Sequence, residues 1–140
     1  MTAATRTFSW PSRVRFVDTD ASGRIHYTAL FRFFEAAEFE FMRSIGHPYG
    51  RLDPAQVIRY PRVHVEADFK AALRCDDDIT TQVAVERVGG ASYTLAFTVL
   101  FDGAEAASGR ITVVCMHCGT GKSHPLPGDL AASLRERIGP

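Results

Sequence analysis

One strongly apolar helical segment, followed by segments that all alternate, is the feature that most constrains how this chain can fold. Between residues 27 and 45, apolar side chains recur with the spacing of one helix face. This face comprises Leu30, Phe33, Phe34, Ala37, Phe41 and Ile45. Phe31, Phe39 and Met42 lie outside it, so the helix is apolar on more than one side. We therefore expect other elements to cover this helix on several sides.

The remainder of the sequence has the two-residue period of β-strands. The alternating segments after the helix are residues 63–70, 79–85, 93–101 and 111–115. A short segment before the helix, 13–18, also alternates, and residues 128–138 have the spacing of a short terminal helix. Asp102-Gly103 is a hairpin signal. This order predicts an α+β domain, with an antiparallel sheet of about five strands wrapped around one long helix.

Length and composition are those of one soluble domain. The 140 residues suit a single domain, 1–140, in which we expect residues 1–12 to be a loose N-terminal segment. Sixteen basic and sixteen acidic residues cancel, so net charge favours neither nucleic acid nor an anionic membrane as a partner. The first residues lack the apolar run of a signal peptide, and three cysteines argue against a secreted disulfide framework. We expect a cytoplasmic protein.

Two motifs could hold a metal, and neither is complete. Residues 18–25 match the start of a calcium loop, but position twelve of that loop is Ala29 rather than a bidentate carboxylate. Cys115 and Cys118 have C-x-x-C spacing without a second pair, so we interpret them as structural cysteines. No nucleotide-binding loop or nucleophile elbow is present. The sequence therefore predicts no metal and no organic cofactor.

Two carboxylates, Asp18 and Asp20, lie in a turn directly before the helix. They could simply be turn-forming residues, since aspartate favours turns. Alternatively, a carboxylate beside a helix N-terminus faces free backbone N–H groups. Those N–H groups can polarise a carbonyl while the carboxylate attacks it or activates water. The residues alone leave both interpretations open.

These residues belong to a longer pattern. Residues 14–46 resemble the first half of the hot-dog-fold thioesterases of the 4-hydroxybenzoyl-CoA thioesterase and acyl-CoA thioesterase family. That family has a strand, D-x-D-x-x-G, a few apolar or aromatic residues, and a helix with R-[FW]-[FL]-[DE]. The matching residues here are Asp18, Asp20, Gly23, Tyr27, Arg32, Phe33, Phe34 and Glu35. The resemblance continues through residues 63–78 to the HPLP tail and covers about residues 12–135.

The resemblance implies roles for individual residues. Asp20 matches the catalytic aspartate, acting as nucleophile or general base, and the backbone N–H of Tyr27 would polarise the thioester carbonyl. His26 is assigned to substrate binding, and Asp18 to the turn and a subunit interface. The sequence departs from the family at Ala29-Leu30, where an Asn-Tyr pair is common. It departs again at residues 89–91, Gly-Gly-Ala, where the 4-hydroxybenzoyl enzyme carries basic residues to CoA.

The expected activity is hydrolysis of an acyl- or aroyl-CoA thioester to free acid and CoA, with a carrier-protein thioester as an alternative substrate. Two hypotheses compete with this one. The first is a hot-dog dehydratase that pairs His26 with Asp20, and the second is a non-catalytic protein that binds a hydrophobic ligand. The resemblance also implies a homodimer with a continuous sheet, often paired into a homotetramer, with active sites between subunits. Unpaired strand edges agree with such an assembly.

Overall fold

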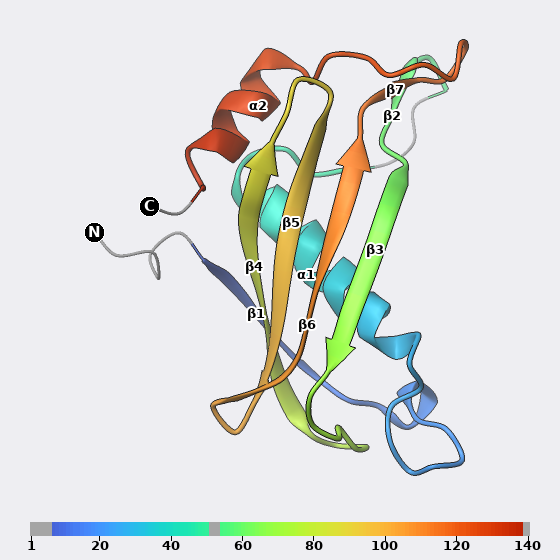
Figure 1. Ribbon diagram of the computed structural model, residues 1–140, viewed down its shortest axis with the longest axis vertical. Coiled ribbons are helices and arrows are strands. Elements are labelled where there is room, and N and C mark those ends of the chain that lie inside the picture. The colour runs from blue at the N-terminus through green and yellow to red at the C-terminus, as the bar shows by residue number, and fades with distance from the viewer. Residues whose placement is uncertain (1–6, 51–53, 139–140) are drawn as a thin grey trace.

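The computed structural model describes residues 7–50 and 54–138. Its main sheet has five antiparallel strands in the order β1-β4-β5-β6-β3 (Figure 1). These strands are β1 (Phe8–Arg13), β3 (Arg62–Phe69), β4 (Asp78–Val88), β5 (Ser92–Phe101) and β6 (Ala104–Val114). Helix α1 (Ala29–Ser44) lies across one face of the sheet, and α2 (Gly128–Arg135) packs against β4. The short strands β2 (Ile58–Arg59) and β7 (Met116–His117) pair separately. The predicted α+β fold with a five-stranded antiparallel sheet is confirmed.

The apolar face of α1 forms the centre of the core. Leu30, Phe34, Ala37 and Phe41 are completely buried, as their spacing predicts. The Phe34 ring stacks on Phe97 of β5, with centroids 4.6 Å apart. Met42, which lies outside the predicted face, is also buried. Apolar burial on this scale, at about 25 cal/mol per Å² of apolar surface, is the main force that holds α1 on the sheet.

Gly109 on β6 permits this close packing. A Cβ at this position would overlap the backbone oxygen of Glu66 and lie 2.7 Å from the ring of Phe34. We expect Gly109→Ala to lower the free energy of unfolding by about 1–3 kcal/mol, because β3 and α1 must both shift. Urea denaturation measures this effect. Gly128→Ala is the matched control, since a Cβ there meets no described atom within 4 Å, and its stability should equal or exceed that of the wild type.

The N-terminal region differs from the expectation in two ways. Residues 1–12 were expected to be loose, but from Phe8 onward they form β1, which pairs with β4 from Phe8↔Val83 to Arg13↔Asp78. A strand was expected over 13–18, but the strand ends at Arg13, and Phe16–Asp18 is a short 3₁₀ turn. Alternation misled here because β1 lies at the sheet edge, where Pro11 is tolerated and neither face needs a regular apolar pattern.

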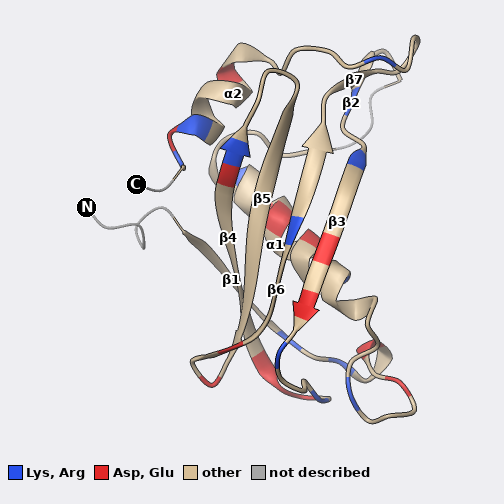
Figure 2. Cartoon of the chain, viewed as in Figure 1, with Lys and Arg blue, Asp and Glu red and all other residues tan. Residues whose placement is uncertain are grey.

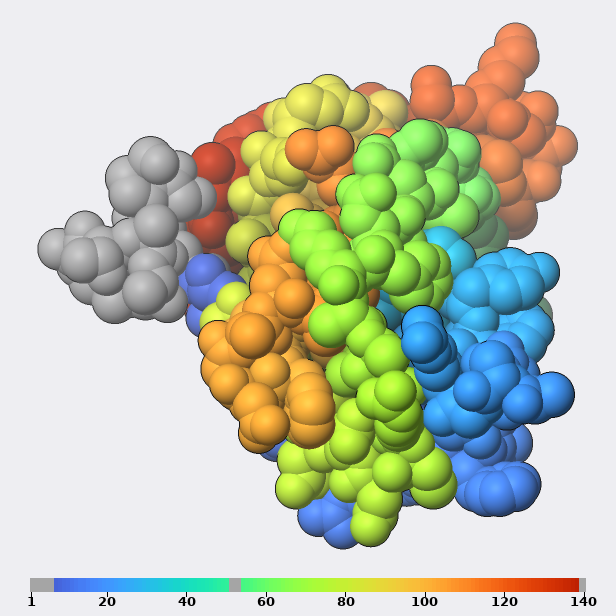
Figure 3. Space-filling view, turned by 60° about the horizontal axis from the view of Figure 1, so that its bottom comes forward, coloured from blue at the N-terminus to red at the C-terminus, as the bar shows by residue number. Residues whose placement is uncertain are grey.

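The apolar side chains of β3 are largely exposed. Val63, Val65 and Phe69 alternate as predicted, and Val65 lies opposite the buried Ile111 on the face that carries α1. These three side chains are nevertheless 60%, 51% and 51% exposed. The reason is that α1 packs toward β1 and β4 and leaves β3 uncovered. In Figure 3, β3 (green) lies at the surface beside the first turns of α1 (light blue).

Candidate active site

Residues 18–25, here termed the Asp20 turn, are held by backbone hydrogen bonds. Asp20 N–H donates to the carbonyl of Arg24, and Gly23 N–H donates to the carbonyl of Asp20, both at 3.0 Å. Gly23 has φ +79°, a conformation that glycine adopts without steric cost. Ile25 N–H donates to the carbonyl of Leu73 at 3.0 Å, which docks the turn beside the end of β3. The turn therefore has a fixed position in front of α1.

Asp18 joins this turn to the helix. It is only 6% exposed, and its carboxylate accepts hydrogen bonds from Arg15 N–H at 2.8 Å and from the Arg32 guanidinium at 2.9 Å. Its carbonyl accepts His26 N–H at 2.7 Å. Since Arg32 lies in the first turn of α1, Asp18 orients the start of the helix. The interpretation of Asp18 as a turn residue agrees with these contacts.

Asp20 is exposed, and its two carboxylate oxygens differ. Oδ1 accepts both Ser22 N–H at 2.8 Å and the Ser22 hydroxyl at 2.6 Å. Oδ2 accepts no hydrogen bond from the described residues. The Ser22 hydroxyl and then its backbone N–H hold the pKa of Asp20 below its usual value, because both bonds favour the charged form. One oxygen is thus anchored, and the other is free to act on a substrate.

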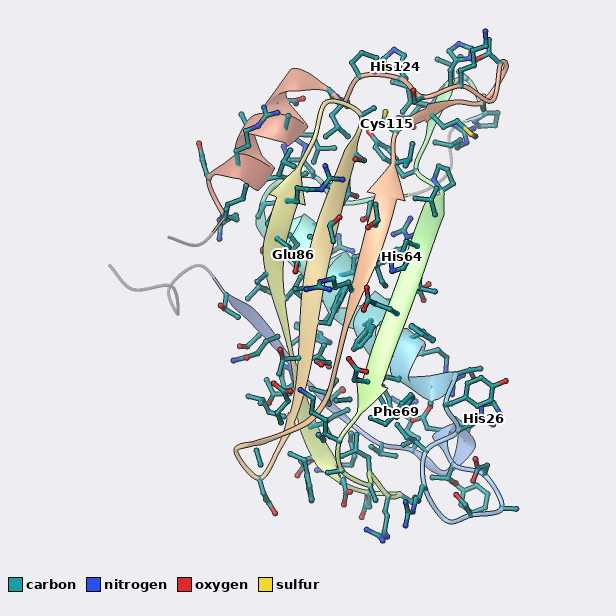
Figure 4. The ribbon with its side chains drawn as sticks, in the orientation of Figure 1. His26, His64, Phe69, Glu86, Cys115 and His124 are labelled. Atoms are coloured by element: carbon teal, nitrogen blue, oxygen red, sulfur yellow. The ribbon has the colours of Figure 1, made fainter. Side chains whose placement is uncertain are left out.

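The chain between the Asp20 turn and α1 carries a backbone donor, the N–H of Tyr27. Within the described ranges, no protein acceptor pairs with the N–H of Tyr27, whereas Ala29 N–H donates to the carbonyl of His26 at 2.8 Å. The Tyr27 ring is exposed and stacks on His26, with centroids 4.5 Å apart. His26 Nδ1 lies 2.8 Å from the Thr28 hydroxyl and accepts Thr28 N–H at 3.2 Å. The Asp20 turn, His26 and Tyr27 therefore lie at the N-terminal end of α1, since His26 N–H donates to the carbonyl of Asp18 and the His26 ring stacks on Tyr27. Figure 4 labels His26 at this end of the helix.

A cavity of about 660 Å³ lies at the other end of β3, and the sequence did not predict it. Several separate segments contribute to it: α1, the segment after α1, β2, the start of β3, β7 and the start of α2. Its apolar and aromatic walls include Phe39, Met42, Tyr49, Ile58, Tyr60, Met116 and Leu130. Arg62 is among the polar lining residues. No local pattern indicates such a cavity, because each segment contributes only one or a few side chains.

A buried polar cluster lies against this cavity. Glu38 of α1 is 1% exposed, and its carboxylate accepts hydrogen bonds from the Tyr49 hydroxyl and the Arg62 guanidinium. The hydroxyls of Tyr49 and Tyr93 are 2.9 Å apart, and the Arg62 guanidinium lies 5.0 Å from the centre of the Tyr49 ring. Burial raises the pKa of Glu38 above its ordinary value, while Arg62 and Tyr49 oppose that shift. Burial also raises the pKa values of both tyrosines, so their hydroxyls stay protonated.

The other motifs have simpler surroundings. Cys115 is completely buried, with Sγ 3.7 Å from the carbonyl of Pro125, and Cys118 is exposed. Across residues 7–50 and 54–138, the His, Cys, Asp and Glu side chains form no group of three that could hold a metal ion. The helices in this part of the chain are too short or too polar to span a membrane.

Fold and site together define the class of protein. The family model of the thioesterase-like superfamily matches residues 14–134, and the chain therefore belongs to this superfamily. The predicted hot-dog fold and the predicted thioester-hydrolysing enzyme are both confirmed.

Individual relatives cover nearly the whole chain. An acyl-CoA thioesterase, YbgC, of Haemophilus influenzae is 25% identical over 91% of this chain and 93% of its own length. A 1,4-dihydroxy-2-naphthoyl-CoA hydrolase of Prochlorococcus marinus is 28% identical over 88% of this chain and 84% of its own. Among solved structures, a 1,4-dihydroxy-2-naphthoyl-CoA thioesterase from Synechocystis has a TM-score of 0.87 at 18% identity, covering 93% of this chain and 96% of its own, and supports the fold.

Proposed function

We propose that this chain hydrolyses acyl- or aroyl-CoA thioesters to the free acid and CoA, with Asp20 as nucleophile or general base. The observation that carries the proposal is an anchored, ionised Asp20 with a free Oδ2 in the turn before α1, together with an N–H of Tyr27 at the start of that helix that has no acceptor among the described residues. That N–H lies at the positive end of α1, where a developing oxyanion is stabilised. Relatives named acyl-CoA thioesterase and 1,4-dihydroxy-2-naphthoyl-CoA hydrolase support the substrate class.

Two routes give the same products. As a nucleophile, Asp20 Oδ2 attacks the thioester carbonyl and the CoA thiolate leaves, after which water hydrolyses the mixed anhydride. As a general base, Asp20 takes a proton from water while that water attacks, and the proton passes to the departing thiolate. In both routes the N–H of Tyr27 donates to the carbonyl oxygen. His26 would orient the acyl chain through its stacked pair with Tyr27.

Release of free thiol tests this function. A chromogenic thiol reagent and a panel of aliphatic and aromatic acyl-CoA esters should show thiol release that depends on the enzyme. A dehydratase acting on hydroxyacyl thioesters would leave the thioester intact. A binding protein would release no thiol at all. Within the described residues, no hydrogen bond joins the side chains of His26 and Asp20, which disfavours their pairing as a dehydratase acid and base.

The site also calls for a second copy of the chain. The β3 edge offers unpaired backbone groups and exposed valines, and it contains neither proline nor glycine, whereas Pro11 interrupts the opposite edge. Two copies of β3 related by a two-fold axis perpendicular to the sheet would pair antiparallel and form one continuous sheet. A second α1 would then cover Val63 and Val65. We propose a homodimer through β3, able to pair further into a homotetramer.

This pairing would complete the active site. In one chain, the Asp20 turn lies at the Phe69 end of β3 and the cavity lies at the Arg62 end. Antiparallel pairing brings the Phe69 end of one copy beside the Arg62 end of the other. The cavity of each protomer would therefore receive the acyl group of a thioester cleaved by Asp20 of the partner.

The predicted cytoplasmic location stays a prediction.

Light scattering tests the assembly. The wild-type protein should have at least twice the mass of the 15.4 kDa chain at micromolar concentration. Val65→Lys should shift it toward the monomer, because a charge then lies in the paired edge. Ser9→Lys is the control, since Ser9 is also exposed but lies on β1, at the opposite edge of the sheet. A wild-type protein that stays monomeric at this concentration would refute the dimer and the shared site.

The pH dependence of activity tests the state of Asp20. Removing the Ser22 hydroxyl removes the main cause that lowers the pKa of Asp20, so this pKa should rise in Ser22→Ala. Since the charged form is active, the acid limb of kcat/KM should move to higher pH. Ser9→Ala, on the exposed part of β1, should leave the limb unchanged. An unmoved limb in Ser22→Ala would exclude Asp20 as the group that titrates there.

A further inference from the structure

An apolar cavity that only binds hydrocarbon does not need a polar cluster such as that of Glu38, Tyr49, Arg62 and Tyr93. Withdrawing a carboxylate and a guanidinium from water is costly, and apolar side chains of similar volume often stabilise a fold as well or better. Glu38 is nevertheless almost completely buried, on the helix that forms the centre of the core. A function in the cavity would explain why charged groups occupy this position.

The hydrogen bonds of the cluster have only one consistent direction. Tyr49 has a single proton, which it donates to Glu38, so the Tyr49 oxygen accepts the proton of Tyr93. Both hydroxyl protons are therefore used inside the cluster. Arg62 donates to Glu38 and to the carbonyl of Tyr60, and a guanidinium has more N–H groups than these two bonds use. Arg62 thus retains donors for another acceptor.

Those remaining donors belong to a side chain that lines the cavity. The Arg62 side chain is 32% exposed, and its guanidinium lies over the Tyr49 ring. Glu38 compensates its positive charge, so the pair offers N–H donors without a net charge. Phe39, Tyr49 and Tyr60 give the cavity aromatic walls. A planar group with an uncharged oxygen at its edge matches both the walls and the donors.

We infer that Arg62, held in place by Glu38 and Tyr49, is a specificity-determining residue that binds an acceptor oxygen on the acyl group. Arg62 thereby selects hydroxyl- or oxo-substituted aromatic acyl thioesters over unsubstituted ones. This inference rests on the proposed thioesterase function and names its substrate class. A site built to hydrogen-bond a substrate group discriminates strongly against the analogue that lacks it, because the donors of the site are then left unpaired.

The inference is tested with benzoyl-CoA and with its 2-, 3- and 4-hydroxy derivatives, each of which adds one oxygen to benzoyl-CoA. The wild type should prefer at least one hydroxy derivative by about tenfold or more in kcat/KM, the discrimination expected of a hydrogen bond to a charged group. The double variant Glu38→Gln/Arg62→Met removes both charges together and leaves Tyr49 an amide acceptor. Its preference should fall below about threefold, since a neutral pair offers no charged donor.

Ratios of kcat/KM measured on one preparation are independent of the folded fraction, so a purely structural role would not change them. Arg110→Met is the matched control. Arg110 forms ion pairs with Glu86 and Glu66, at 2.7 and 3.7 Å, on the sheet face away from α1. Figure 2 shows acidic and basic positions along β3, β4 and β6. Arg110→Met should retain the wild-type preference.

The single variant Glu38→Gln changes the charge of the cavity instead of removing its charged donor. It is also the more conservative variant, and it serves as the test if the double variant does not fold. It leaves Arg62 charged and uncompensated, so the cavity gains a positive charge. The kcat/KM for 4-carboxybenzoyl-CoA, relative to benzoyl-CoA, should rise by about tenfold or more over the wild-type ratio. An unchanged ratio would mean that Glu38 does not control the charge that the acyl group meets.

Binding separates the two levels of the proposal. In an Asp20→Asn background, the preferred hydroxybenzoyl-CoA should bind more tightly than benzoyl-CoA, and Glu38→Gln/Arg62→Met should remove that difference. If the wild type released no CoA from any ester, the proposed function would fail. If it released CoA from benzoyl-CoA and all three hydroxybenzoyl esters at equal kcat/KM, the thioesterase would stand and the role of Arg62 would be refuted.

Discussion

Replacement of Asp20 by Asn is expected to lower kcat for thioester hydrolysis by at least about 100-fold, the lower range for the loss of acid–base catalysis. The amide keeps the shape of the side chain and can still accept hydrogen bonds from Ser22 through its oxygen. It removes the negative charge and the basicity of Oδ2. KM should change little, because Asp20 acts on the reacting carbonyl, whereas binding depends on the CoA moiety and the acyl cavity. Thiol release under saturating substrate measures the effect.

Asp18→Asn is the matched control in the same turn. One oxygen of the Asp18 carboxylate accepts the N–H of Arg15, and the other accepts the guanidinium of Arg32. In asparagine an NH₂ group replaces one of these oxygens and cannot accept a hydrogen bond, so one of the two donors loses its acceptor. We expect a loss of about 1–3 kcal/mol in the free energy of unfolding, with kcat of the folded fraction much less affected than in Asp20→Asn. Near-normal kcat in a folded Asp20→Asn protein would rule out its role as nucleophile or base, and Glu35 or Asp18 would then need separate tests.

Two inactive variants of this protein are expected to restore each other's activity when they assemble together. Asp20→Asn removes the catalytic carboxylate, and Ile58→Trp fills the cavity, which Ile58 lines. In a mixed dimer, one site combines the intact Asp20 of one protomer with the open cavity of its partner. When equal amounts of the two variants assemble at random, about half of the dimers are mixed. Each mixed dimer has one intact site of its two, so about a quarter of wild-type activity should return.

The same experiment excludes a site within one chain. If each cavity served the Asp20 of its own protomer, every intact Asp20 in the mixture would face a filled cavity, and no activity would return. Co-expression with two affinity tags isolates the mixed species. Three controls should recover no activity. Two are the homodimers of each variant, and the third is an Asp20→Asn dimer in which the two copies carry different affinity tags. Failure of the mixed species to exceed these controls would place both parts of the site in one protomer.

The sequence by itself determined the elements with strong local periodicity. The apolar face of α1 predicted Leu30, Phe34 and Phe41 as core residues, because a helix buries one stripe whatever it packs against. Asp102-Gly103 predicted its hairpin, because both residues adopt the positive φ values that such a turn requires, +52° and +76°. The resemblance carried by the D-x-D-x-x-G pattern before the helix predicted Asp20 and Tyr27 as site residues, and residues so close along the chain need no tertiary fold to bring them together.

The tertiary structure alone decided what depends on contacts between distant segments. β1 forms because β4 offers it a free edge, and not because residues 8–13 alternate. Alternation predicted the strand β3 but not whether its valines are buried, because burial depends on which element covers a face, and α1 lies toward the other side of the sheet. The cavity and the cluster around Glu38 join segments from α1 to α2, and no sequence pattern encodes their convergence, because the hydrogen bonds of a buried carboxylate are set by the positions of the folded chain.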